Sequence, residues 1–273
     1  MGTKRPGGRG IAARYEGRQG PQGPVWNIMS RTPPHPQNSW RQLHCLQINL
    51  HRAIAASYRL SALVEQHCLD FVAIQEPWAT KGRINGLQTK TCKLIYDNNV
   101  DRPRTAIMIN KTIKSLPITE LIQRDLVAVQ AEVPSTRGTR IIVFASLYLP
   151  GDAEEAVSLE LQQLTEYCRI RNLQWVMCCD ANAHHTVWGS TDINTRGESL
   201  FDYITTNNLM VVNKGNEPTF VNAIREEVLD LTLASAFISN NISNCSMLEK
   251  NSLSDHRYIR FNLKGEVETR NVR

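Results

Sequence analysis

The stretch WVMCCDANAHH, residues 175–185, carries the pattern that decides the fold and leads to the candidate site. It opens with a continuous apolar run over Trp175–Cys179, which is typical of a strand buried on both faces. The run ends at Asp180, and Asn182 follows it two positions later. Side chains alternate along extended backbone with period two, so both polar groups are expected to point the same way. A rigid strand therefore presents two polar side chains together at its end.

Alternating strand and helix patterns extend outward from this strand over residues 41–273. Ser135–Gly138 forms a turn between two strands and predicts a hairpin. Because many turns have hairpin length and no repeat or linker interrupts the region, we expect one mixed α/β sandwich domain rather than a purely parallel sheet. The predicted strands are Leu43–Asn49, Leu69–Gln75, Cys92–Tyr96, Thr105–Asn110, Leu126–Val133, Arg140–Leu149, Trp175–Cys179, Met210–Asn213, Val228–Leu233, Ile242–Met247 and Tyr258–Leu263. The predicted helices are Ala53–His67, Ala153–Ile170 and Gly197–Asn207.

Residues 1–40 differ in composition from the rest of the chain. They are rich in Gly, Arg and Pro, and they predict a disordered leader that does not pack. The whole net charge of +5 falls in this segment, which we interpret as a solvated tail in preference to an arm for nucleic acid. Its charged residues are Lys4, Arg5, Arg9, Arg14, Arg18 and Arg31 against Glu16 alone.

Composition excludes several classes of protein. No run approaches the roughly 20 apolar residues of a membrane helix, and the N-terminus lacks the apolar core of a signal peptide. Seven cysteines without a C-x-x-C pair fit reduced core thiols in an intracellular protein. Cys178 and Cys179 near His184 and His185 do not favour zinc, because adjacent residues of a strand face opposite ways.

Polar side chains stand at the ends of the predicted strands in six places. Ligand sites in layered α/β folds gather at strand ends, where the scaffold positions a few polar groups. Helix caps, turns or a core tyrosine would explain most of them singly. Asp230 is harder to explain in this way, because a carboxylate between Leu229 and Leu231 is costly without a dedicated partner. The residues are Asn49, Glu76, Tyr148, Asp180, Asn182, Asp230, Asp255 and His256.

This ordered set, from about Leu43 to Leu263, resembles the endonuclease/exonuclease/phosphatase superfamily. The resemblance implies a deoxyribonuclease-I-like fold, a four-layer α/β/β/α sandwich of two mixed, mostly antiparallel sheets. Within the superfamily the chain is most similar to the apurinic-type endonuclease domain of jockey-like non-LTR retrotransposons. The motifs that carry this are NAHH at 182–185, VWGS at 187–190, GNEPTF at 215–220 and LDLTL at 229–233.

The sequence departs from the family pattern in two places. Cys179 and Ala181 replace a Gly and a Phe that members often have. His51 stands where repair-type relatives usually have an acidic residue, which puts repair-type metal ligation in doubt.

The resemblance also implies a role for each residue. Glu76 matches the principal metal-binding glutamate, with Asn49 beside it and Asp255 as a metal-associated aspartate. Tyr148 matches the tyrosine that contacts the scissile phosphate. The pair Asp180 and Asn182 matches the residues that orient the attacking water and the phosphate. Asp230 matches the aspartate that holds the catalytic histidine, His256.

The chemistry of these residues suits a phosphodiester. An anionic phosphodiester repels hydroxide, so a divalent ion must neutralise charge, and oxygen ligands favour Mg²⁺, with Mn²⁺ as the alternative. A carboxylate beside an imidazole raises the pKa of the imidazole and fixes its tautomer. Either Asp180 is the general base beside a protonated His256, or a neutral His256 is the base.

The segment after Asn182 raises a separate question. Trp188 belongs either to the core or to a flat surface for DNA, and His185 is the second DNA-binding candidate. We expect His184 and His185 to hydrogen-bond locally rather than to bind metal.

Three functions compete at this stage. The first is a DNA endonuclease that nicks one strand of duplex DNA and leaves a 3′-hydroxyl primer, acting inside the cell and in the nucleus. Because the chain shows no reverse transcriptase motif, this function would need that partner, for example in a longer parent polyprotein. The second is abasic-site repair, or RNA or lipid phosphodiester hydrolysis, within the same superfamily. The third is a nuclease fold that binds nucleic acid without cutting it.

Overall fold

The computed structural model describes Gly2 and residues 42–135, 138–153 and 155–265. The compact unit that holds the three longer ranges spans Trp40–Arg273. The leader predicted for residues 1–40 lies outside the described residues, except for Gly2.

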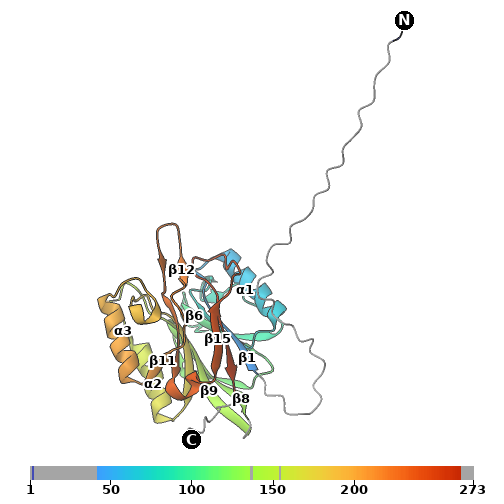
Figure 1. Cartoon of the computed structure of the whole chain (residues 1–273). Coiled ribbons are helices and arrows are strands. Elements are labelled where there is room, and N and C mark those ends of the chain that lie inside the picture. The colour runs from blue at the N-terminus through green and yellow to red at the C-terminus, as the bar shows by residue number, and fades with distance from the viewer. Residues whose placement is uncertain (1, 3–41, 136–137, 154, 266–273) are drawn as a thin grey trace. The chain divides into compact units, whose positions relative to one another are not determined.

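Two six-stranded sheets form the centre of the compact unit (Figure 1). All neighbouring strands are antiparallel except two parallel pairs, β1 with β2 and β9 with β10. The first sheet contains, in spatial order, β15 (Ile242–Met247), β16 (Ile259–Lys264), β1 (Gln42–Asn49), β2 (Phe71–Gln75), β6 (Thr105–Asn110) and β5 (Cys92–Ile95). The second contains β11 (Leu209–Val211), β14 (Asp230–Ser235), β10 (Gln174–Asp180), β9 (Gly138–Tyr148), β8 (Leu126–Ser135) and β7 (Ser115–Ile122).

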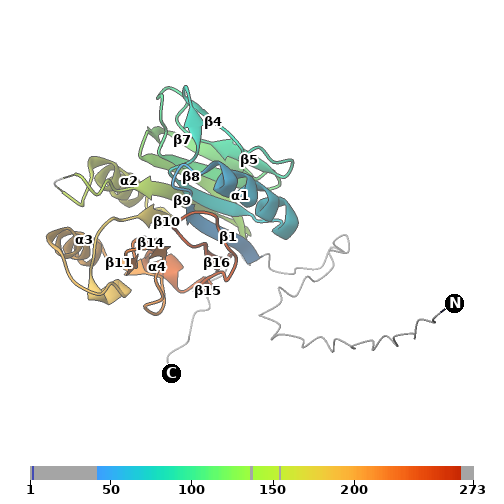
Figure 2. The ribbon, with the colours of Figure 1, turned by 90° about the horizontal axis from the view of Figure 1, so that it is seen from above.

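Helices cover the outer faces of the sheets. Figure 2 shows α1 on one side of the sheets and α2 and α3 on the other. Their bounds are Ile54–His67, Leu159–Ile170 and Thr195–Thr206. The predicted four-layer α/β/β/α sandwich of mixed, mostly antiparallel sheets is confirmed. Shorter elements are β3 (Ala79–Thr80), β4 (Arg83–Ile84), the 3₁₀ turn η1 (Thr186–Trp188), β12 (Phe220–Val221), β13 (Glu226–Glu227) and α4 (Ala236–Ser239).

The core follows the period-two alternation of the strands. In β10, Val176 and Cys178 pack between the two sheets, whereas Trp175, Met177 and Cys179 pack against the helices of the second sheet. Cys178 and Cys179 therefore face opposite ways, as expected. Both thiols are free, and burial raises the pKa of each above its ordinary value.

Polar side chains cross the space between the sheets near one end. Gln47 of β1 donates to the Cys179 carbonyl at 3.0 Å and accepts from the Thr232 hydroxyl at 3.1 Å. Gln75 of β2 donates to the Ser146 hydroxyl at 3.0 Å. Buried polar groups are costly unless they are paired in this way, so these bonds favour one relative placement of the two sheets.

Most predicted elements exist within a few residues of their expected bounds, and the β8–β9 hairpin is confirmed. The helix expected from Ala153 begins at Leu159, because Ser158 caps it by accepting from the Leu161 amide. Strand β7 was not predicted, since it is a largely exposed edge strand that contains Pro117. In the described ranges no helix has both the length and the apolar character needed to cross a membrane.

Candidate active site

Strand register brings the predicted polar residues to one end of the sandwich. In the first sheet Asn49 of β1 pairs with Gln75 of β2, and Glu76 follows directly. In the second, Asp180 of β10 pairs with Tyr148 of β9 on one side and with Asp230 of β14 on the other. Parallel strands end at the same edge, and β14 runs antiparallel, so it begins where β10 ends.

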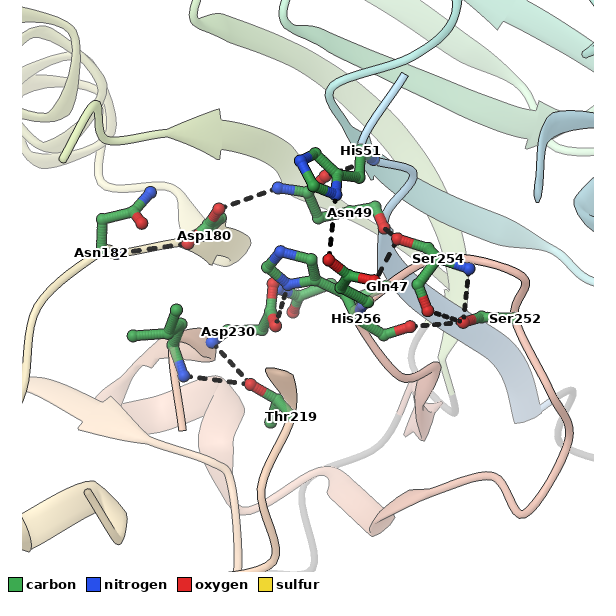
Figure 3. Close-up of polar contacts among 12 residues, drawn as sticks. Gln47, Asn49, His51, Asp180, Asn182, Thr219, Asp230, Ser252, Ser254 and His256 are labelled. Carbon is green, nitrogen blue, oxygen red and sulfur yellow. Dashed lines mark hydrogen bonds and ion pairs between the residues drawn. The ribbon is translucent and has the colours of Figure 1, made fainter. Parts of the chain in front are cut away.

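A hydrogen bond joins the two sheets at this end. The Asn49 amide donates to Oδ2 of Asp180 at 2.8 Å, and the Asn182 backbone amide donates to Oδ1 at 3.2 Å (Figure 3). Asp180 is buried. Burial and the charge of Asp230 raise the pKa of Asp180 to about 7, against the lowering effects of His256 and of the Asn49 bond. The carboxyl group is therefore able to accept or release a proton near neutral pH.

His256 and Asp230 form a buried dyad. Nδ1 of His256 lies 2.7 Å from Oδ2 of Asp230, and the two side chains are 6% and 1% exposed (Figure 3). Burial alone would lower the pKa of His256, but the charge and the hydrogen bond of Asp230 outweigh it and raise that pKa to about 9. The imidazole is charged at neutral pH in consequence.

Thr219 holds the aspartate of the dyad from behind. Its hydroxyl oxygen accepts from the backbone amides of Leu229 and Asp230 at 3.0 and 2.9 Å. The next residue, Phe220, sets the edge of its ring against His256, with 5.0 Å between ring centroids. Thr219 and the first residue of β12, Phe220, thus support the two members of the dyad.

The segment before His256 is fixed to the first sheet. The Ser254 hydroxyl donates to the Asn49 carbonyl at 2.8 Å, and the Ser252 hydroxyl donates to the His256 carbonyl (Figure 3). These bonds place the imidazole against the Asn49–Asp180 bridge. Asp180, Asp230 and His256 each offer a ligand-type atom within 4.8 Å of the others. Within this group, Oδ2 of Asp230 already pairs with Nδ1 of His256.

Glu76 stands at the end of β2 with its side chain 8% exposed. It forms an ion pair with Arg52. Its negative charge also contributes to the raised pKa of Tyr148 and of His256, so Glu76 acts electrostatically on both residues. Glu76 and Asn182 both have φ of +44°, a conformation rare for residues other than glycine. Such strain persists where the surrounding structure imposes it, and it is concentrated at functional sites.

The three predicted metal ligands, Asn49, Glu76 and Asp255, do not form one compact group in the described part of the chain. Asn49 Oδ1 accepts from the His51 amide at 2.7 Å, and Nδ1 of His51 lies 3.4 Å from the exposed Asp255 carboxylate. Among the described residues, two groups of three His, Cys, Asp or Glu side chains lie close enough together to hold a metal ion. Neither group contains Glu76 or Asp255. The donors are all oxygens, which fits Mg²⁺ or Mn²⁺, and Glu76 is the one charged donor that is buried.

Tyr148 ends β9 beside Asp180. Arg104 lies over its ring, with the guanidinium carbon 4.7 Å from the ring centroid, and Asp125 pairs with that guanidinium. Burial, together with the charges of Glu76 and Asp180, raises the pKa of Tyr148 to about 12. The phenol therefore keeps its proton and is able to donate a hydrogen bond to an anionic oxygen.

The DNA-facing role predicted for Trp188 is wrong in this structure, and the core alternative holds. The indole is 1% exposed and donates to the Ala183 carbonyl at 3.3 Å. His185 is also buried: it accepts from the Val187 amide and stacks on Phe201, with 4.5 Å between ring centroids. A ring without accessible surface has no face on which a base could stack.

Several residues of the site were not predicted as such. Thr219 lies in the GNEPTF stretch, which indicated the family without indicating a role. Arg52 and Arg104 were missed, since an arginine in a loop carries no spacing signal. Arg196, in the first turn of α3, was also missed; it donates to the Asn182 carbonyl at 3.0 Å and so supports the loop after Asp180.

The two stacked sheets and the strand-end site with its histidine–aspartate dyad define the class: the chain has the deoxyribonuclease-I-like fold, which members of the endonuclease/exonuclease/phosphatase superfamily share. The family model described as endonuclease-reverse transcriptase matches residues 142–260. That range contains Tyr148, Asp180, Asn182, Asp230 and His256. The resemblance to the nucleases of this superfamily, and to those of non-LTR retrotransposons within it, is confirmed.

Solved structures with the same fold include several nucleases. The endonuclease domain of TRAS1, a telomere-specific non-LTR retrotransposon, is similar with a TM-score of 0.70 and 23% identity, over 81% of this chain and 98% of that one. The apurinic endonuclease LMAP from Leishmania major has a TM-score of 0.62 at 11% identity, over 83% and 89%. The catalytic domain of Xenopus laevis APE2 has a TM-score of 0.62 at 10% identity, over 83% and 94%. No curated protein matches the chain.

Proposed function

We propose that this chain is a divalent-metal-dependent DNA endonuclease of a non-LTR retrotransposon, which nicks duplex DNA and leaves a 3′-hydroxyl. The observation that carries the proposal is the convergence of Asp180, bridged to Asn49, with the buried Asp230–His256 dyad at one end of the sandwich. This arrangement supplies a base, a positive charge and oriented donors within a few ångströms. Phosphodiester hydrolysis needs all three.

The pKa values suggest which residue takes which role. Asp180, with a pKa of about 7, serves as the general base that accepts a proton from the attacking water. His256, charged below a pKa of about 9, stabilises the negative charge that develops on the phosphate oxygens. Tyr148 and Asn182 donate hydrogen bonds that orient the phosphate. This assignment selects the first of the two alternatives left open by the sequence.

A bound Mg²⁺ ion, or Mn²⁺ in its place, would neutralise phosphate charge, and Glu76 and Asn49 would hold it together with Asp255. In this structure the Arg52 guanidinium forms an ion pair with the Glu76 carboxylate. Release of Arg52 would leave its guanidinium beside the site, where it can pair with DNA phosphate.

An arginine-lined hollow beside Glu76 supports duplex DNA as the substrate. The hollow has a volume of about 260 Å³, and it is lined by Arg52, Pro77, Trp78, Ala79, Arg102, Pro103, Arg104 and Arg124. Guanidinium groups bind phosphate oxygens with two parallel hydrogen bonds. A phosphate backbone that enters the hollow would bring the neighbouring phosphodiester to Glu76.

The retrotransposon setting is supported by the family description, which names an endonuclease with a reverse transcriptase, and by the similarity to the TRAS1 domain. A nick with a 3′-hydroxyl would prime reverse transcription by a reverse transcriptase partner, encoded in the same polyprotein. The site of action would then be inside the cell, in the nucleus.

The test is nicking of supercoiled plasmid by the full chain with Mg²⁺, with and without a chelator. We expect open circles that require the metal ion, and no phosphate release from inositol phosphates. The variant Phe237→Ala is a matched control, because Phe237 is an exposed aromatic of α4, which follows the end of β14 opposite to Asp230. Phosphatase activity without DNA cleavage would contradict the proposal.

Abasic-site endonuclease is the second candidate, because the similar structures include apurinic endonucleases. A duplex with a single abasic position, compared with the intact duplex of the same sequence, separates the two functions. Strong preference for the abasic duplex would favour repair. Similar rates on both would favour the retrotransposon role.

A further inference from the structure

A second cluster of ligand-type side chains lies outside the dyad, on the segment after β10 and on β13. His184, Asp192 and Glu227 each offer one atom, and these atoms lie within 4.8 Å of one another. Nδ1 of His184 lies 2.6 Å from Oδ1 of Asp192, which is the local hydrogen bond expected for this histidine. None of the three has a role in the proposed hydrolysis.

Glu227 is the residue that this local pairing leaves unexplained. It is 9% exposed, and its Oε1 accepts from the Thr191 hydroxyl at 2.8 Å. Its other oxygen, Oε2, is buried and has no hydrogen-bond partner among the described residues. A buried carboxylate oxygen without a partner is costly, and a bound cation is one of the few groups that removes the cost.

The backbone holds His184 in a fixed position at the cluster. Asn194 Oδ1 accepts from the His184 amide at 3.1 Å, and the Asn194 amide donates back to the His184 carbonyl at 3.1 Å. Helix α3 passes so close that a Cβ on Gly197 would lie 1.7 Å from that carbonyl oxygen. Only glycine fits at this position, so the contact fixes the loop that carries the imidazole.

We propose that His184, Asp192 and Glu227 bind a Zn²⁺ ion. One imidazole nitrogen and two carboxylate oxygens form a mixed donor set that suits Zn²⁺, with water in the fourth position, whereas Mg²⁺ prefers oxygen donors alone. Ligand atoms of a tetrahedral Zn²⁺ ion stand roughly 3.4 Å apart. The cluster therefore needs only small side-chain movements to close around the ion.

Such an ion would link the loop after β10 to the strands that support the dyad. Glu227 pairs with Phe220 across the β12–β13 hairpin, and its carbonyl accepts from the Thr219 amide at 2.9 Å. Thr219 in turn holds the Asp230 backbone, and Phe220 touches His256. The ion is thus structural and lies outside the reaction itself.

The test is Zn²⁺ binding to the full chain in excess Mg²⁺, measured by equilibrium dialysis with metal analysis and by the shift in melting temperature. Wild type should bind one equivalent and melt at a higher temperature with Zn²⁺. Glu227→Gln and His184→Asn should weaken binding at least about tenfold and lose the shift, as expected when a group that holds a metal is removed. Glu226→Gln is the matched control, since Glu226 is the exposed neighbour on the same strand.

Asp192→Asn keeps the test decisive if Glu227→Gln or His184→Asn fails to fold, because Asp192 is exposed and its replacement should still weaken binding. Absence of stoichiometric Zn²⁺ binding would overturn the proposal. Binding that persists in all three cluster variants, or that is lost in Glu76→Ala instead, would overturn it as well. The measurement reads the ion directly, so its outcome is independent of whether the chain cuts DNA.

Discussion

Replacement of Asp230 by asparagine tests the dyad most closely, because it keeps the shape of the side chain and removes its charge. The pKa of His256 is about 9, against 6.5 for an ordinary histidine. This difference corresponds to about 3 kcal/mol in favour of the charged imidazole. If that charge acts on the transition state, its loss should slow nicking at neutral pH by about two orders of magnitude.

The pH profile separates this effect from a general loss of structure. Wild-type nicking should rise as Asp180 loses its proton near pH 7 and fall as His256 loses its proton near pH 9. In Asp230→Asn the alkaline limb should move toward neutral pH, because burial, which lowers the pKa of His256, then meets less opposition. Single-turnover nicking across this pH range is the assay.

A double variant completes the test. Since Asp230 acts through His256, Asp230→Asn combined with His256→Ala should be little slower than His256→Ala alone. Rate losses that multiply, or an Asp230→Asn profile with its alkaline limb unmoved, would refute the reasoning and leave Asp230 as a structural carboxylate. Melting curves of all variants show whether they remain folded.

Four further outcomes are expected. Glu76→Ala should abolish nearly all nicking with an unchanged melting temperature, and wild-type cleavage by this variant would reject the metal assignment. Trp188→Ala should lower the stability by about 3–5 kcal/mol in denaturant unfolding, because it removes a buried indole; a loss of DNA affinity alone would restore the DNA-facing role. Deletion of residues 1–40 should leave the rate at saturating DNA unchanged while affinity becomes less sensitive to salt, whereas loss of folded protein would move the domain boundary. Finally, the raised pKa of His256 should stabilise the folded protein, because the folded state holds the proton more tightly than the unfolded state does. This contribution to stability is complete below pH 6.5 and is lost as pH rises through about 9. The difference in melting temperature between wild type and His256→Ala should therefore shrink over that pH range.

The ends of the strands were predictable because period-two alternation and strand register act locally. Asp180 and Asn182 follow an apolar run that only a buried strand explains, and Asp230 interrupts another apolar stretch where a partner was required. The structure supplies that partner in His256 and adds the bridge from Asn49, which depends on contacts between distant parts of the chain.

The surroundings of the site were not predictable in the same way. Trp188 lies in a polar segment, and its burial depends on packing into the core between the second sheet and its helices, which the segment itself does not indicate. The role of Thr219 depends on which backbone amides reach its hydroxyl, and no spacing in the sequence encodes that. Tertiary contacts therefore decide these residues, whereas local periodicity decides the strands.

The most direct measurement of the central claim is the chemistry of the ends at the nick. Plasmid nicked by the full chain with Mg²⁺ is offered to a DNA polymerase and labelled nucleotides, without prior repair of the ends, beside plasmid treated with Glu76→Ala. The account predicts label incorporated at the nick made by wild type and none with the variant or with chelator present. Absence of any nick, or a nick that becomes extendable only after phosphatase treatment, would contradict it.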